Sequence, residues 1–130
     1  MLVSFFDYLW KMEFEMHTTE KGLIAELHGE ERLVNDLDDA LDLVANASYQ
    51  GAGTVMVYDY QLHPDFFRLA SGLAGEILQK FSNYRMRMII LGDFSATQSK
   101  SLRDFIRESN RYGHIIFANN REEVLDKKAG

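Results

Sequence analysis

Two short segments near the start of the chain alternate apolar and polar residues, which is typical of β-strands with one buried face. They are residues 14–18 and 23–27. The sequence Glu20-Lys21-Gly22 between them supplies a turn in which glycine can take a positive φ, so the two strands are expected to pair as a hairpin. Three later runs, residues 54–58, 86–91 and 115–118, are apolar almost throughout. This pattern is typical of strands that are buried on both faces.

Between these strands the apolar residues recur at intervals of three and four, which predicts amphipathic helices. We expect helices over residues 32–47, from Pro64 to Phe81, from Ser99 or Ser101 to Gly113, and for a short stretch after Asn120. Aspartates crowd the start of the first helix, where the helix dipole favours negative charge. Gly72 and Gly75 fall in the middle of the second helix.

The predicted element order is β-β-α-β-α-β-α-β-α. Strands that alternate with helices imply an α/β fold with a mixed, mostly parallel sheet covered by helices and an antiparallel hairpin at one side. No internal repeat or linker is visible, so we expect residues 12–130 to form a single domain. Residues 1–11 fall outside this pattern and are predicted to be an N-terminal appendage, whose aromatic side chains would need a cover such as a dimer partner.

Composition narrows the function classes. The net charge of −6 argues against a nucleic-acid-binding surface, which needs clustered lysine and arginine. The chain has no cysteine, which excludes disulfides, thiolate catalysis and cysteine-based zinc sites. No apolar run reaches the roughly 20 residues of a membrane helix, and the start of the chain lacks the basic stretch and cleavage site of a signal peptide. We therefore expect a cytoplasmic protein that binds no membrane.

The common catalytic and cofactor-binding motifs are missing. The chain has no glycine-rich dinucleotide or phosphate-binding loop after a strand and no nucleophile elbow. Its four histidines are not paired at metal-ligand spacing within a helix, and the acidic run at residues 36–42 departs from a calcium-binding loop. The sequence thus predicts no catalytic residue, no metal site and no cofactor, and leans against an enzyme.

One candidate ligand site follows from the sheet. Ligands of open α/β sheets bind at the carboxyl ends of the parallel strands. Here this edge would carry a group of polar residues that could bind a ligand: Asp59, His63, Asp93, Ser95 and Ser99. The alternative is structural, because a Gly-Asp pair makes a turn and hydroxyl groups cap helices.

Two helix surfaces are candidates for binding a protein partner. In the second helix a strip partly opposite the apolar stripe contains Arg68, Gly72, Gly75 and Glu76, and glycine there removes bulk where another backbone could approach. In the third helix Arg103 and Arg107 belong to a basic stripe that could receive an acidic partner. The alternatives are that neighbouring segments fill the space beside the glycines, and that the arginines pair with acidic residues on their own helix.

The sequence also resembles a known family. The segments Leu73-Ala-Gly-Glu-Ile-Leu-Gln-Lys-Phe81, Gly92-Asp-Phe-Ser95 and Ser99-Lys-Ser-Leu-Arg-Asp-Phe-Ile106 resemble a bacterial domain of unknown function, DUF4180. The resemblance runs from about Phe14 to Leu125 and implies no particular activity. The element order is separately similar to STAS domains of anti-sigma factor antagonists, which are switched by phosphorylation. This chain has no hydroxyl residue at the matching helix start, Gln61 to Phe66.

The sequence is compatible with two functions. The first is a non-enzymatic protein-interaction or regulatory domain, self-associating as a homodimer, which the missing catalytic motifs and the helix glycines favour. The alternative is a small-molecule binder or modest enzyme that uses the strand-end residues around Asp59, His63, Asp93 and Ser95.

Overall fold

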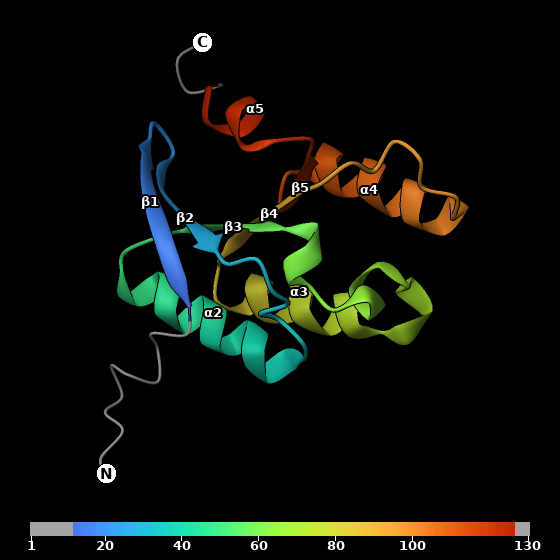
Figure 1. The fold of residues 1–130 in the computed structure, drawn as a ribbon, viewed down its shortest axis with the longest axis horizontal. Coiled ribbons are helices and arrows are strands. Elements are labelled where there is room, and N and C mark those ends of the chain that lie inside the picture. Colours follow the sequence, from blue (N-terminus) through green and yellow to red (C-terminus); the bar gives the residue numbers. More distant parts are fainter. Residues whose placement is uncertain (1–11, 127–130) are drawn as a thin grey trace.

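The computed structural model describes residues 12–126, and its centre is a five-stranded sheet (Figure 1). The strands are β1 (Glu13–Thr19), β2 (Gly22–His28), β3 (Thr54–Tyr58), β4 (Arg87–Leu91) and β5 (Ile115–Ala118). They lie in the sheet in chain order, and β1 pairs antiparallel with β2 while every other pair is parallel. The predicted α/β fold with a mostly parallel sheet and an edge hairpin is confirmed. The predicted appendage, residues 1–11, lies outside the described residues.

The helices follow the predicted order: α2 (Leu37–Tyr49), α3 (Leu73–Asn83), α4 (Lys100–Tyr112) and α5 (Arg121–Asp126). Their ends are set by capping. Asp36 accepts a hydrogen bond from the Asp39 amide, Ser99 accepts one from the Leu102 amide, and Gly113 ends α4 with a φ of 77°. The predicted start of the first helix near residue 32 is wrong, because Val34 forms an isolated parallel bridge with Leu62 instead.

The long helix predicted from residue 64 to 81 is also wrong in its first half. Residues 59–71 form three short 3-10 turns, Asp59–Gln61, Pro64–Phe67 and Leu69–Ser71, before α3 begins. Gly72 separates the turns from α3 with a φ of 82°, a conformation that cannot continue a helix. The apolar spacing misled the prediction because 3-10 turns also repeat side chains at every third residue. Gly72 is therefore the N-cap of α3, and Gly75 lies in its first turn.

The two faces of the sheet are covered unequally. One face, which we call the covered face, packs side chains such as Leu27, Val57 and Ile90 against α2 and α3, with Phe105 and Ile106 of α4 beside them. The opposite face carries a smaller cluster: Ile24, Met56, Ile89, Leu91 and Ala118, with Val124 and Leu125 of α5. We call it the open face, because α5 is the helix packed on it in residues 12–126; in Figure 1 α5 lies on the far side of the sheet from α2 and α3.

None of the helices in the described part of the chain has the length and apolar character that a membrane-spanning segment needs.

Candidate functional site

A cluster of polar side chains lies on the open face where α5 begins. We call it the polar cluster; its members are Glu15, His17, Glu26, Tyr58 and Arg121. The hairpin register places Glu15 directly opposite Glu26, and His17 lies two positions further along β1 on the same face. Tyr58 ends β3, and the first residue of α5 brings Arg121 above the strands.

Glu26 is the centre of the polar cluster and is only 1% exposed. His17 Nε2 lies 2.8 Å from Glu26 Oε1, and the Tyr58 hydroxyl donates to Glu26 Oε2 at 2.8 Å. Arg121 donates to Glu26 Oε1 from Nη2 at 3.0 Å and from Nε at 3.2 Å. A buried carboxylate needs such partners, since an unpaired buried charge is strongly destabilising.

These contacts set the ionisation of the polar cluster. Burial would raise the pKa of Glu26, but hydrogen bonds from His17, Tyr58 and Arg121 outweigh it and hold this pKa below its ordinary value. Burial, together with the hydrogen bond to Glu26 and its negative charge, raises the pKa of Tyr58 to about 12. Glu26 is therefore ionised and Tyr58 protonated at neutral pH. Neither suits general acid–base catalysis, which works best with a pKa near the working pH.

The polar cluster also has a set of possible metal ligands. His17 Nε2 and one carboxylate oxygen each of Glu15 and Glu26 lie within 4.8 Å of one another. The other oxygen of Glu15, Oε1, lies 2.9 Å from His28 Nε2. One imidazole nitrogen and two carboxylate oxygens form a donor set that zinc and similar divalent ions accept.

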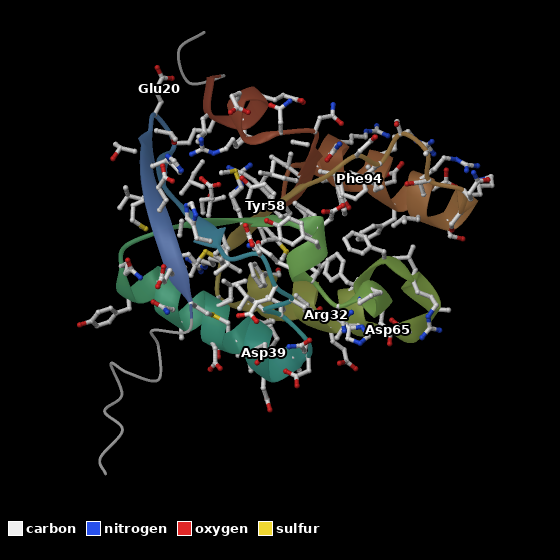
Figure 2. All side chains as sticks on the ribbon, viewed as in Figure 1. Glu20, Arg32, Asp39, Tyr58, Asp65 and Phe94 are labelled. Atoms are coloured by element: carbon white, nitrogen blue, oxygen red, sulfur yellow. The ribbon has the colours of Figure 1, made fainter. Side chains whose placement is uncertain are left out.

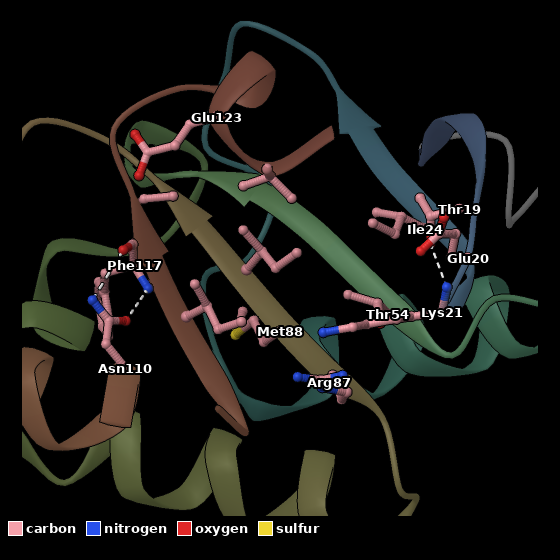
Figure 3. A pocket seen from close by; sticks show the side chains of 14 residues that line it. Thr19, Glu20, Lys21, Ile24, Thr54, Arg87, Met88, Asn110, Phe117 and Glu123 are labelled. Carbon is pink, nitrogen blue, oxygen red and sulfur yellow. Dashed lines mark hydrogen bonds between the residues drawn. The ribbon is translucent and has the colours of Figure 1, made fainter. Parts of the chain in front are cut away.

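A pocket of about 350 Å³ lies beside the polar cluster on the open face. The two sites are neighbours, because Ile24 and Val124 line the pocket while Glu26 and Arg121 of the same elements belong to the polar cluster. The pocket extends from the β1–β2 turn, across the beginnings of β3 and β4, to α5 (Figure 3). Its apolar wall residues include Ile24, Ile89, Ile116, Ala118 and Val124.

The charged groups of the pocket are distributed unevenly. Lys21 from the hairpin turn and Arg87 from the start of β4 lie at one end, together with the acidic Glu20 of the same turn. Glu123 lies at the opposite end (Figure 3). Arg87 is oriented by a hydrogen bond of 2.8 Å from its Nη2 to the Gly113 carbonyl. The edge of the sheet next to the pocket is closed by Asn110, whose amide group bonds to both the N–H and the carbonyl of Phe117. The pocket thus combines an apolar wall with a basic end.

The strand-end residues predicted to bind a ligand mainly make local turn and cap contacts. Asp93 accepts hydrogen bonds from the Ser95 amide at 3.0 Å and the Ser95 hydroxyl at 2.6 Å, and these bonds lower the pKa of Asp93. Asp59 accepts from the Tyr60 amide, and His63 Nδ1 accepts from the Asp65 amide. Ser99 caps α4.

The structure brings these strand-end residues together only in part. Asp93 and Ser95 are bonded, and Asp59 lies so close to Gly92 that a Cβ there would be 2.6 Å from its Oδ2. In residues 12–126 no hydrogen bond joins Asp59 or His63 to Asp93 or Ser95, and none of the candidates lines the 350 Å³ pocket. Between Asp93 and Ser95, the Phe94 ring packs on Phe67 and Phe117 and anchors the loop (Figure 2).

The residues predicted to bind a partner have mixed surroundings. Arg107 and Lys100 both pair with Asp104 on the same helix. Arg103 donates to the carbonyls of Thr97 and Gln98. The basic residues of α4 therefore make local contacts, which was the alternative to binding an acidic partner.

The remaining partner candidates lie around the start of α3. Arg68 pairs with Asp65, Gly72 caps α3, and Glu76 lies in the first turn of α3. A Cβ at Gly75 would meet no described atom within 4 Å, so nothing in residues 12–126 fills the space beside this glycine.

Sequence analysis missed the polar cluster and the pocket. The signal was present in the alternation of the hairpin, which places Glu15 and His17 on one face and Glu26 and His28 on the same face of the paired strand. The i, i+4 spacing that brings two histidines together applies to helices, whereas on a strand residues i and i+2 share a face. Arg121 comes from far along the chain, and no local pattern connects it to the hairpin.

Comparison with known proteins identifies the family. A search of curated proteins and of solved structures gave no match, so the similarity to STAS domains stays one of element order. A family model described as "Domain of unknown function (DUF4180)" matches residues 19–127, which include most of the sheet and all the described helices. The resemblance in the sequence blocks is confirmed, and the chain belongs to the DUF4180 family.

Proposed function

We propose that the protein is a non-enzymatic ligand-binding domain whose pocket on the open face takes a small, mostly apolar molecule with a negative charge. The observation that supports the proposal is the 350 Å³ pocket with apolar walls and Lys21 and Arg87 at one end. Pockets that bind small organic molecules begin at about 300 Å³ and combine apolar walls with a few polar groups.

Charge and shape each contribute to this proposal. The chain carries a net charge of −6, so a pocket end with two basic side chains, Lys21 and Arg87, against one acidic side chain, Glu20, is a local exception. Its positive excess favours an anion over a cation. Glu123 at the other end disfavours a second negative group there. The ligand class is therefore a carboxylate or similar anion at the end of an apolar body.

A direct test measures the binding of octanoate, octan-1-ol and octylammonium to the full chain by isothermal titration calorimetry. We expect octanoate to bind with 1:1 stoichiometry, more tightly than octan-1-ol, and octylammonium to bind most weakly. Replacement of Lys21 by glutamate should weaken octanoate binding by about threefold or more and leave octan-1-ol binding unchanged. Lys100→Glu is the matched control, because it makes the same charge change on exposed α4, away from the pocket.

Two results would overturn the proposal. One is equal binding of the three compounds, which would mean that the basic end has no influence. The other is an equal loss of octanoate affinity in Lys21→Glu and Lys100→Glu, which would mean that charge affects binding only through the net charge of the chain.

A second candidate function is the self-associating interaction domain that the sequence favours. The observation behind it is the open space beside Gly75 at the exposed start of α3. Solution mass by light scattering tests it: a dimer that Gly75→Gln converts to a monomer supports it, and a monomeric protein at all concentrations contradicts it.

A further inference from the structure

We propose that Glu15, His17 and Glu26 form a binding site for a divalent transition-metal ion such as Zn²⁺, for which the Arg121 side chain competes. The site is separate from the proposed anion pocket and does not depend on it. Its three donor atoms come from paired strands of one hairpin, so the sheet itself fixes their spacing. Sites on strands and helices hold ligand geometry better than sites on loops.

The two carboxylates are oriented by neighbouring side chains. Tyr58 donates to Glu26 Oε2, which leaves Glu26 Oε1 directed at His17 Nε2, 2.8 Å away. His28 Nε2 lies 2.9 Å from Glu15 Oε1, which leaves Glu15 Oε2 at 3.6 Å from the same nitrogen of His17. Such outer partners are what hold metal-ligating carboxylates in place in known sites. Glu26 is almost fully buried, so its oxygen is well fixed.

Arg121 marks the position of a cation among these three donors. Its Nη2 atom lies 3.0 Å from Glu26 Oε1, 3.3 Å from Glu15 Oε2 and 3.4 Å from His17 Nε2. One positive group therefore touches each of the three donor atoms at once. Because the Arg121 side chain is 34% exposed, it can move out to solvent, whereas the buried Glu26 cannot.

The donor set indicates the class of metal. Zinc binds imidazole nitrogen and carboxylate oxygen at about 2.0–2.2 Å, and three protein ligands plus an open position are common in its sites. Tetrahedral bonds of that length separate donors by roughly 3.4 Å. Glu15 Oε2 and His17 Nε2 are close to this spacing at 3.6 Å, whereas His17 Nε2 and Glu26 Oε1, 2.8 Å apart, have to separate when a metal binds. Magnesium and calcium prefer oxygen ligands alone and should bind more weakly.

Metal binding and Arg121 docking exclude each other, because both use Glu26 Oε1 and Glu15 Oε2. Arg121 is the first residue of α5, which otherwise packs on the sheet through Val124 and Leu125. Occupation by a metal should therefore loosen α5. This gives a readout that is independent of affinity: faster amide hydrogen exchange in residues 121–126 when Zn²⁺ is present.

The test titrates the full chain with Zn²⁺ alone by calorimetry. We expect 1:1 binding that becomes roughly tenfold tighter or more in Arg121→Gln, since the competing cation is gone. Adding His17→Gln to Arg121→Gln should weaken binding by a similar factor. His114→Gln, also in the Arg121→Gln background, is the matched control: His114 is exposed and lies outside the donor set.

A loss of metal binding can be distinguished from a loss of folding. Circular dichroism of each variant shows whether it is folded, and His17 offers a milder change than the buried Glu26. Equal Zn²⁺ affinities of the parent chain and Arg121→Gln would show that Arg121 does not compete with the metal. Zn²⁺ binding that His17→Gln and His114→Gln weaken alike, or no saturable binding in Arg121→Gln, would overturn the site itself.

Discussion

The covered face and the open face are built by the same strands, yet they bury different chemistry. The covered face packs apolar side chains against α2, α3 and α4, and several of them, among them Leu27, Val57 and Ile90, have no exposed surface. In the described residues the open face has one short helix, α5, together with a buried glutamate, an arginine and a pocket. We infer a division between the faces: the covered face stabilises the fold, and the open face is the side available for binding a ligand or an ion.

Energetics supports this division. Burial of an apolar side chain such as leucine or isoleucine stabilises the folded state by about 1.5–3 kcal/mol. A buried ion pair is a poor substitute, because removing two charges from water offsets much of their attraction. The Glu26–Arg121 pair therefore adds less to stability than an apolar contact of similar size would, and it also ties the first residue of α5 to β2.

The largest expected effect compares two neighbouring residues of β4, one on each face of the sheet. Ile89 and Ile90 are neighbours on β4 that face the open and the covered side. Ile90→Ala should lower the free energy of unfolding by about 3–5 kcal/mol, because it leaves a cavity among close-packed residues. Ile89→Ala should cost about half as much, because Ile89 lines the pocket and its loss enlarges a space that already exists. Urea unfolding of both variants measures the difference.

The two variants serve as each other's control, since they remove the same atoms from adjacent positions. Equal losses of stability would show that the open face is packed as tightly as the covered face, and the division between the faces would fail.

The next effect concerns the buried charge of the open face. The pKa of Glu26 is lower in the folded chain than its ordinary value of 4.5. Its ionised form therefore stabilises the fold above about pH 4.5, and this stabilisation is lost as the pH falls through the lower folded pKa. Glu26→Gln should cost about 2 kcal/mol at pH 7 and less at pH 3. Unfolding by urea at several pH values measures both.

Glu13→Gln is the control for this experiment, because Glu13 is an exposed glutamate on β1, the strand that pairs with β2. A cost of Glu26→Gln that stays constant between pH 7 and pH 3 would show that the carboxylate charge has no role in stability.

The sequence predicts most of the elements that build the covered face, but it does not predict the site on the open face. Apolar runs and alternation predict all five strands, and Ser99 and Gly113 are recognisable caps because their effects are local. The start of α2 was missed because Val34 pairs with Leu62, a contact that only the folded chain creates. Gly72 ends the 3-10 turns through its backbone conformation, while the apolar spacing continues across it.

The site was harder for the same reason. Glu15, His17 and Glu26 share a face by strand alternation, and this part was within reach of the sequence. Arg121 is 95 residues from Glu26, and the pocket is closed by α5 only after the whole sheet has formed. A site assembled from distant segments leaves no pattern in any one of them.

A smaller effect concerns the ionisation of Tyr58 on the open face. The pKa of Tyr58 is raised to about 12 by burial and by its bond to Glu26. Its protonated form is favoured in the folded chain, so this stabilisation is complete below pH 10 and is lost as the pH rises toward 12. Titration of tyrosinate absorbance should show one late-titrating residue that disappears in Tyr58→Phe, with a cost of about 1 kcal/mol at pH 7. Tyr84→Phe, at an exposed position, should leave the late step in place.

The smallest effect lies on the helices of the covered face and has the opposite sign. Gly75 is inside α3, and a Cβ there would meet no described atom within 4 Å. Gly75→Ala should therefore raise the free energy of unfolding by about 0.5–1 kcal/mol, because alanine favours the helix and loses less entropy on folding. Gly72→Ala should do the reverse, since a φ of 82° strains any residue with a Cβ. If Gly75→Ala instead lowers stability and also the solution mass, the space beside Gly75 is an interface between two chains, and the covered face takes part in recognition as well.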